Sequence, residues 1–178
     1  LLGLHVQQIV DRLDPAADAF GITNMWSFSW MVVRDIIRAI KAKHPDKPIV
    51  AGGEHFTGLP EYSMEQSPID YIVTGEGEEG AIEVFAAIER KASIDEVSKI
   101  AGIWYRSAQG KPTKSLLVRE RKKNIDEIPW PAWEYFDVEA YSSNRLVSGI
   151  YYGKTVPILA TRGCPYQCTY CSSPNMWT

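Results

Sequence analysis

Short apolar runs alternate with segments of helical periodicity through the first half of the chain, and this alternation restricts the fold more than any other feature. Each apolar run ends in polar or glycine residues, as buried parallel strands do at the edge of a sheet. The predicted strands cover residues 19–24, 48–51 and 69–74. The predicted helices cover residues 4–13, 31–44, 60–66 and 79–91. Strands that alternate with helices form β-α-β units with right-handed crossovers, so the sequence predicts a doubly wound α/β domain built on a parallel sheet.

The pattern changes after this α/β segment. Residues 101–106 and 116–118 have the composition of strands and flank a turn-like stretch, 107–111, so we expect a β-hairpin here. The charged stretch that follows, 119–123, is interpreted as a solvated connector, with a phosphate-binding patch as the alternative.

Two prolines and two tryptophans in residues 128–133 predict a stiff interdomain linker. Beyond it, the apolar residues 155–161 predict the first strand of a new domain. We therefore expect an α/β domain over 1–92, a hairpin and linker over 93–154, and the start of a second domain over 155–178. The chain begins with a residue other than Met and stops soon after its last cysteine, so we expect that both ends are cut.

Charge and hydropathy exclude two classes of partner. The formal net charge is -3 and the isoelectric point is about 5.7, so the basic face that binds nucleic acid is not expected. No apolar run approaches the roughly 20 residues that a membrane-spanning helix needs, and the N-terminus has no signal-peptide pattern. We therefore expect a cytoplasmic protein with neither nucleic acid nor membrane as a partner.

All three cysteines of the chain, Cys164, Cys168 and Cys171, lie within eight residues. One tight loop can present three such thiolates to a single iron-sulfur cluster, and Gly163 and Pro165 help the backbone to turn around it. Three ligands leave one iron of a four-iron cluster open to a small molecule. The alternatives are a zinc site without its fourth ligand, or incidental thiols.

The segment Cys164-Pro-Tyr-Gln-Cys168-Thr-Tyr-Cys171 resembles the C-x-x-x-C-x-x-C signature of the radical S-adenosylmethionine (SAM) superfamily, which lies after the first strand of a βα barrel. The resemblance implies that the three cysteines bind a 4Fe-4S cluster and that the fourth iron chelates SAM. It also implies that SAM is cleaved to a 5'-deoxyadenosyl radical. Tyr170 matches an aromatic position that packs near the adenine of SAM, and an ordinary packing tyrosine is the alternative.

Three segments of the first domain, residues 21–23, 49–55 and 70–78, look like the second half of the cobalamin-binding domain that precedes many radical SAM domains. Residues 128–132 also resemble the linker of that family. The resemblance implies a Rossmann-like, flavodoxin-type fold that is truncated at its N-terminus and is followed by the start of a radical SAM βα barrel. In such sheets, ligands bind beyond the carboxyl ends of the strands.

The expected cobalamin contacts follow from this placement. They are Thr23, Asn24, Gly52, Gly53, His55, Thr74, Gly75, Glu76 and Gly77. The chain lacks the Asp-x-His-x-x-Gly motif that supplies a cobalt ligand elsewhere, so His55 is alternatively a structural histidine. Glu76 and Glu78 can instead stabilise a helix N-terminus, and Trp26, Phe28 and Trp30 can line a corrinoid face or pack in the core.

The resemblance implies an enzyme that uses its cluster to form a carbon radical and cobalamin to deliver a methyl group, or to assist a rearrangement or ring closure. Magnesium-protoporphyrin ester cyclases are related to this group. The expected partners are a small-molecule or natural-product substrate and a reducing donor such as flavodoxin or ferredoxin. The alternatives are a radical SAM enzyme without cobalamin, and a non-catalytic zinc or interaction module. We expect this fragment alone to be inactive.

Overall fold

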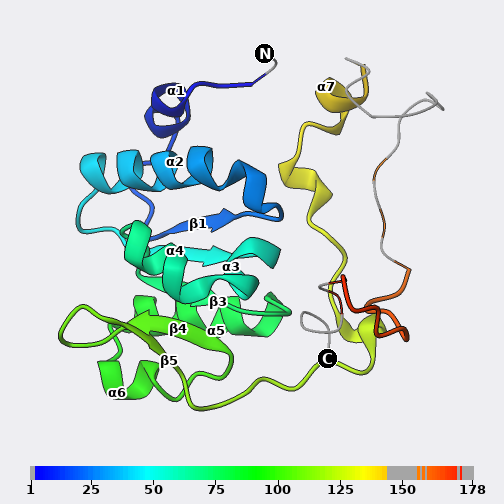
Figure 1. Cartoon of the computed structure of the whole chain (residues 1–178). Coiled ribbons are helices and arrows are strands. Elements are labelled where there is room, and N and C mark those ends of the chain that lie inside the picture. The colour runs from blue at the N-terminus through cyan, green and yellow to red at the C-terminus, as the bar shows by residue number, and fades with distance from the viewer. Residues whose placement is uncertain (1–2, 144–155, 157, 159, 172, 174–178) are drawn as a thin grey trace.

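The computed structural model describes residues 3–143, 156, 158, 160–171 and 173. Its centre is a five-stranded sheet in which the strands follow one another in sequence order. The strands are β1 (Phe20–Thr23), β2 (Ile49–Gly52), β3 (Tyr71–Val73), β4 (Ile103–Arg106) and β5 (Pro112–Lys114). The first three strands are parallel, and the last two run antiparallel to their neighbours (Figure 1).

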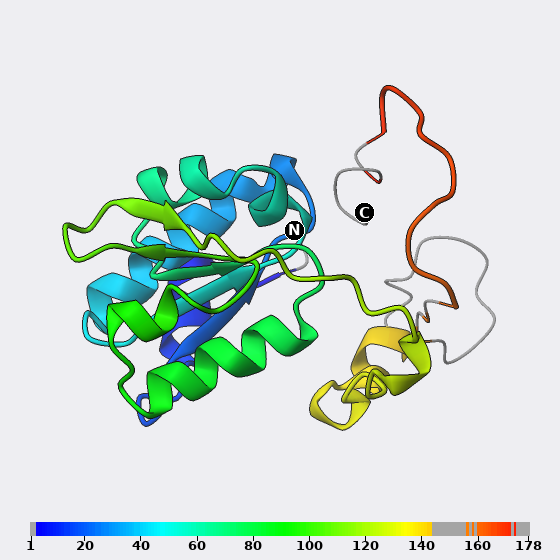
Figure 2. The same ribbon diagram turned by 90° about the horizontal axis from the view of Figure 1, so that it is seen from below.

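Helices cover both faces of this sheet (Figures 1 and 2). One face carries α2 (Trp30–Lys43), α3 (Glu54–Gly58) and α4 (Pro60–Gln66), and α1 (Val6–Asp11) packs on α2. The other face carries α5 (Glu78–Glu89) and α6 (Ile94–Val97). The domain thus has the three-layer α/β architecture that the sequence predicts.

The alternation of side chains along β2 divides the core between these two faces. Ile49 and Ala51 pack in the cluster formed with α2 and α4, whereas Val50 packs in the cluster formed with α5 and α6. All three side chains are buried. A strand that is buried on both faces is typical of a parallel sheet covered by helices, which explains the continuous apolar run.

The helix ends follow local rules. Lys41 and Lys43 lie in the last turn of α2, where positive charge is favourable, and α4 begins with Pro60 in its first turn. Glu78 and Glu79 lie in the first turn of α5, where negative charge is favourable. The short helices α3 and α6 were not predicted, because each is too short to produce a periodic apolar pattern.

The β-hairpin prediction is wrong in its second strand. The turn forms as expected, with Gly110 at a φ of 75° and Ser107 N donating to Lys111 O at 2.9 Å. Because this turn is tight, pairing with β4 begins at once, at Pro112. Leu116, Leu117 and Val118 therefore lie beyond β5 and are exposed. The hairpin extends the sheet through β3, so the sheet is mixed rather than purely parallel.

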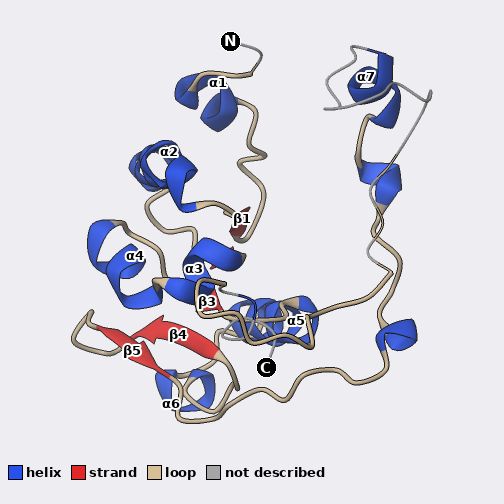
Figure 3. Ribbon diagram, turned by 45° about the vertical axis from the view of Figure 1, so that its right-hand side comes forward, coloured by secondary structure: helices blue, strands red, loops and turns tan. Residues whose placement is uncertain are grey.

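The chain then leaves the sheet and passes its carboxyl edge (Figure 3). This segment contains two 3-10 turns, Ile125–Glu127 and Trp133–Tyr135, and α7 (Val138–Ser143). Within the predicted strand 155–161, residues 155, 157 and 159 lie outside the described residues, and the others form no strand. No helix among the described residues combines the length and the apolar character needed to cross a membrane.

Candidate functional site at the carboxyl edge of the parallel strands

The carboxyl ends of the first three strands lie side by side. Thr23 pairs with Gly52, and Gly52 pairs with Val73, so the three strands end at the same level of the sheet. Asn24 N donates to Gly52 O at 3.0 Å and extends this edge by one residue. Ligands of doubly wound sheets bind beyond such an edge, which makes it the candidate site.

The turn after β2 packs tightly against β1 through a glycine. Gly53 has a φ of 104°, and a Cβ atom at this position would lie 2.7 Å from Asn24 O and 2.9 Å from Thr23 Oγ1. Only glycine adopts this conformation without strain and leaves room for the adjacent backbone. His55 N also donates to Asn24 O, at 3.1 Å, so the turns after the two strands form one rigid edge.

Thr57 joins the turn after β2 to the turn after β3. Its hydroxyl donates to Gly53 O at 3.1 Å and accepts from Gly75 N at 2.9 Å. Thr74 has its hydroxyl engaged with Gly102 O at 2.8 Å. Around Gly75 and Gly77, a Cβ atom would meet nothing within 4 Å, so the backbone at these two positions is open to a ligand.

His55 lies in the core beneath this edge. Only 4% of it is exposed, and its imidazole stacks on Trp30. Its Nδ1 is 2.9 Å from Ser27 Oγ, and its Nε2 is 3.3 Å from Ser63 Oγ. Burial lowers the pKa of the imidazole. Because serine hydroxyls engage both ring nitrogens, this geometry favours the structural role and leaves no nitrogen free for cobalt.

Asn24 is the buried polar side chain of the edge. It is 4% exposed, and its Oδ1 accepts from Ser29 Oγ at 2.5 Å. No hydrogen-bond acceptor for its Nδ2 occurs among the described residues, and Trp30 Nε1 is likewise unpaired there. A buried donor without a partner costs free energy, so an acceptor from a bound ligand would stabilise the Asn24 amide.

The aromatic residues after β1 divide into a core and a surface group. Trp30 is buried, whereas Trp26 and Phe28 are 61% and 84% exposed. The rings of Trp26 and Phe28 are stacked, with centroids 5.8 Å apart. Met25 and Met31 are also exposed, so an apolar surface adjoins the strand edge. Exposed apolar surface of this kind indicates a binding site.

Glu76 and Glu78, after β3, contact basic residues from distant parts of the chain. Glu76 Oε1 lies 3.6 Å from Arg121 Nε and 3.7 Å from Arg162 Nη1, distances too long for hydrogen bonds but short enough for strong charge attraction. Glu78 Oε1 is 2.5 Å from Arg162 Nη2. Burial raises the pKa of Glu78, but the hydrogen bond from Arg162, a backbone hydrogen bond and the charge of Arg162 together outweigh this effect, so the pKa is lowered.

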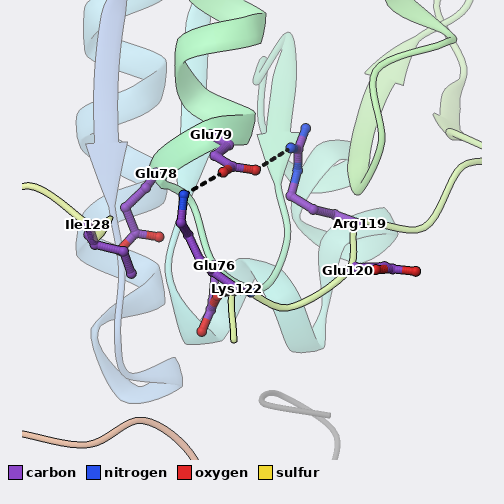
Figure 4. A pocket seen from close by; sticks show the side chains of 7 residues that line it. All are labelled: Glu76, Glu78, Glu79, Arg119, Glu120, Lys122 and Ile128. Carbon is purple, nitrogen blue, oxygen red and sulfur yellow. Dashed lines mark hydrogen bonds and ion pairs between the residues drawn. The ribbon is translucent and has the colours of Figure 1, made fainter. Parts of the chain in front are cut away.

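The charged stretch 119–123 is in part the solvated connector that the sequence predicts, since residues 120, 121 and 123 are exposed, whereas Arg119 and Lys122 are half-buried. Arg119 is paired with Glu79 at 3.3 Å and with Glu83 at 2.6 Å, and Lys122 is paired with Glu79 at 3.1 Å. Figure 4 shows Glu79 between these two cations, beside a small pocket. The carboxylates of α5 therefore neutralise Arg119 and Lys122, which disfavours a phosphate-binding role for these two cations.

The cysteine loop lies on the same side of the sheet as the carboxyl edge (Figures 1 and 2). Cys164 and Cys168 are exposed, Cys171 is half-buried, and all three thiols are free. The backbone turns at Gly163, which has a φ of 80°, and Cys171 N donates to Cys168 O at 3.1 Å. The Ser173 hydroxyl lowers the pKa of the Cys171 thiol, and the charge of Glu54 opposes this effect.

These thiols have the donor chemistry of an iron-sulfur site, but they are not gathered around one point. Among the described residues, no three His, Cys, Asp or Glu side chains are close enough together to hold a metal ion. Tyr170 is 91% exposed, so its contact with SAM and its role as an ordinary packing tyrosine both stay predictions.

Sequence reasoning missed several residues that shape the site. Thr57 and Ser27 organise the edge through hydrogen bonds to residues 18 and 28 positions away in the chain, and Ser63 bonds to His55, eight positions away. Arg162 was also missed as the partner of Glu78, which lies 84 residues before it. No local pattern marks these residues, because each role depends on a contact made only in the folded chain.

A mixed sheet with helices on both faces and glycine turns at its carboxyl edge defines a Rossmann-like ligand-binding domain. Residues 1–85 match the B12 binding domain family, so this part of the chain is similar to B12-binding domains. The predicted resemblance to B12-binding-domain-containing radical SAM proteins and the predicted Rossmann-like fold are confirmed.

Relatives of the chain are methyltransferases and cyclases. An uncharacterized methyltransferase of Pyrococcus horikoshii is 28% identical over 172 residues, which cover 94% of this chain and 34% of the relative. The anaerobic magnesium-protoporphyrin IX monomethyl ester cyclase of Rubrivivax gelatinosus is 28% identical over 177 residues, which cover 97% of this chain and 30% of the relative. The chain thus spans about a third of the length of these relatives.

The fold also matches a solved structure. The radical S-adenosylmethionine methyltransferase TsrM of Kitasatospora setae, solved with cobalamin and a [4Fe-4S] cluster bound, superposes with a TM-score of 0.60 at 21% identity. The match covers 97% of this chain and 33% of TsrM. At this identity, the likeness establishes the fold of the chain.

Proposed function

We propose that the chain belongs to a cobalamin-dependent radical SAM enzyme. The carboxyl edge of β1, β2 and β3 binds cobalamin. Cys164, Cys168 and Cys171 bind a 4Fe-4S cluster whose open iron holds SAM. One observation carries the proposal: the cysteine loop, whose thiols are free, lies on the same side of the sheet as the ligand edge (Figure 1), so the two cofactors would face each other.

The residues of the edge support this assignment chemically. The unpaired Nδ2 of Asn24 is a donor for an amide oxygen of the corrin side chains, and the open backbone at Gly75 and Gly77 admits a flat ligand. Trp26 and Phe28 offer exposed rings beside it. When bound, the cluster supplies the electron that cleaves SAM to a 5'-deoxyadenosyl radical, and cobalamin supplies a methyl group. Tyr170 packs near the adenine once the loop closes.

The reaction that we propose is methylation or rearrangement of an unactivated carbon in a small-molecule or natural-product substrate. The relatives support this class, since they include a cytidylyl-2-hydroxyethylphosphonate methyltransferase of Streptomyces wedmorensis and a magnesium-protoporphyrin ester cyclase. A donor such as flavodoxin or ferredoxin supplies the electron. The free thiols fit a reducing cytoplasmic compartment.

Anaerobic reconstitution of the full-length protein with iron and sulfide tests the cluster. We expect iron-sulfur absorbance and about four irons per chain, lost when all three cysteines are replaced by alanine. Tyr166→Phe, at an exposed side chain of the same loop, is the matched control and should retain the cluster. Stoichiometric zinc without iron would support a zinc module and contradict the proposal.

Binding of hydroxocobalamin to the same protein tests the other cofactor. We expect the corrinoid to remain bound through gel filtration in both the parent protein and the triple alanine variant, because its site lies on the α/β domain. Loss of all corrinoid from a folded, iron-loaded protein would instead support a radical SAM enzyme whose α/β domain is an empty scaffold.

A further inference from the structure

A compact cluster of charges joins the cysteine loop to the α/β domain. Arg162 stands two residues before Cys164, and its side chain is only 16% exposed. Its guanidinium contacts Glu78 at 2.5 Å and faces Glu76 at 3.7 Å. These glutamates lie between β3 and the first turn of α5, so the contact links the loop directly to the ligand edge.

Arg121 completes this cluster from a third segment. It donates to the carbonyl oxygen of Arg162 and lies 3.6 Å from Glu76 Oε1. A Cβ atom on Gly163 would lie 2.8 Å from Arg121 Nη1, so the loop backbone rests against this guanidinium. Two arginines and two glutamates therefore hold the loop at the point where it turns toward its first cysteine.

Burial makes this arrangement more than a surface ion pair. The side chain of Glu76 is 12% exposed, and its buried Oε1 has no hydrogen bond to offset its desolvation among the described residues. Its charge is compensated by the two guanidinium groups. Removal of one arginine leaves a poorly compensated buried carboxylate, which costs more than the loss of an exposed pair.

We propose that Arg162 is a positioning residue, which anchors the cysteine loop to Glu76 and Glu78 and so sets the separation between the cluster and the corrinoid. Glu76 then acts through Arg162 rather than by contact with cobalamin. The role in cofactor spacing rests on the proposed function, whereas the anchor itself is a property of the folded chain. Each cofactor would still bind its own segment without the anchor, and their separation would vary.

Hydrogen exchange in the full-length protein tests the anchor without any cofactor. In Arg162→Gln and Glu78→Gln, we expect the amides of residues 160–171 to exchange about fivefold faster or more. The reason is that loss of a half-buried charge pair makes local opening of the loop more frequent. Lys43→Gln, which removes an exposed pair with Asp11 on the far side of the domain, is the control and should leave the loop unchanged.

Two further variants keep this test decisive. Arg162→Lys retains the charge without the planar fork and should give intermediate protection. The exchanged pair Glu78→Arg with Arg162→Glu should recover part of the protection that either single change loses. If Arg162→Gln does not fold, Glu78→Gln, at a partner whose side chain is 38% exposed, supplies the same measurement. Unchanged exchange in the folded variants would overturn the anchor.

Pulsed electron paramagnetic resonance tests the spacing. With reduced cluster and cob(II)alamin both bound, we expect one narrow distance distribution in the parent protein and a broad one in Arg162→Gln at equal iron and corrinoid content. An unchanged distribution in that variant would overturn the positioning role. Failure of the parent protein to bind either cofactor would contradict the proposed function, while the exchange result would still decide the anchor.

Discussion

The imidazole of His55 stacks on the indole of Trp30, with ring centroids 4.8 Å apart. This contact joins the turn after β2 to the start of α2, directly beneath the ligand edge. Ser27 and Ser63 face the two nitrogens of the same imidazole. His55, which the sequence predicts to contact cobalamin, thus supports the ligand edge from beneath.

The first prediction concerns pH. Burial lowers the pKa of His55 below its ordinary value of 6.5, so the unfolded chain binds a proton at this residue more readily than the folded chain does. The contribution of neutral His55 to stability is therefore complete above pH 6.5 and is lost as the pH falls toward the lowered pKa of the folded state. Urea denaturation between about pH 5 and about pH 7.5, which extends from about 1.5 units below the ordinary pKa to about one unit above it, measures this slope.

Two variants assign this slope to His55. His55→Gln should weaken the pH dependence of the free energy of unfolding, although the variant is less stable throughout. His5→Gln, at an exposed position before α1, should keep the slope of the parent protein. An identical slope in His55→Gln would show that other groups cause the dependence.

The second prediction concerns Gly53. Gly53→Ala forces a side chain into a left-handed conformation and against Asn24 O, so we expect a loss of about 2 to 4 kcal/mol in the free energy of unfolding. Gly58→Ala, where a Cβ atom meets nothing within 4 Å, is the matched control. It should change stability by less than about 1 kcal/mol. Equal effects of the two substitutions in chemical denaturation would contradict the close approach.

The third prediction concerns Arg106, which connects the hairpin to the end of α4. Its guanidinium donates to Met64 O at 2.7 Å, to Ser67 O at 2.8 Å and to Ile69 O at 2.8 Å. Arg106→Ala leaves these carbonyl groups without their donor, and we expect a loss of about 2 to 4 kcal/mol by thermal or urea denaturation. Arg12→Ala, at an exposed side chain, should change stability by less than about 0.5 kcal/mol.

The fourth prediction separates the two tryptophans near the ligand edge. Trp30→Ala removes a buried indole and should cost about 3 to 5 kcal/mol of stability. Trp26→Ala removes an exposed ring, so it should cost less than about 1 kcal/mol while raising the Kd for hydroxocobalamin about fivefold. Equilibrium binding measured on folded protein tests the second part, and an unchanged Kd would show that Trp26 lies outside the corrinoid site.

The elements of the α/β domain were predictable because their signals are local. The apolar runs around Phe20, Ile49 and Ile72 end in polar or glycine residues, and they became the three parallel strands. The helix predicted over 31–44 became α2, in which Ile37 and Ile40 are buried as their spacing indicates, whereas Met31 and Val32 are exposed. The periodicity of apolar residues indicates which side of a helix or strand is buried. A sheet covered by helices requires apolar strands, so these signals can be recognised without knowledge of the rest of the fold.

The register of the hairpin was not predictable in the same way. Leu117 and Val118 have strand-like side chains, but the turn at Gly110 places pairing earlier, at Thr113. Turn geometry determines which residues face each other, and the apolar character of a run does not. His55 likewise carries no local sign of the aromatic and serine neighbours that bury it.

The sequence by itself determined the three parallel strands and the longer helices between them, the glycines of the ligand edge and the spacing of the three cysteines. These features depend on residues that are neighbours along the chain. Only the tertiary structure decided that His55 is buried and that Arg162 meets Glu78, because charges 84 residues apart come together only after the layers have packed. Long-range pairing depends on the shape of the whole fold, and no local periodicity records it.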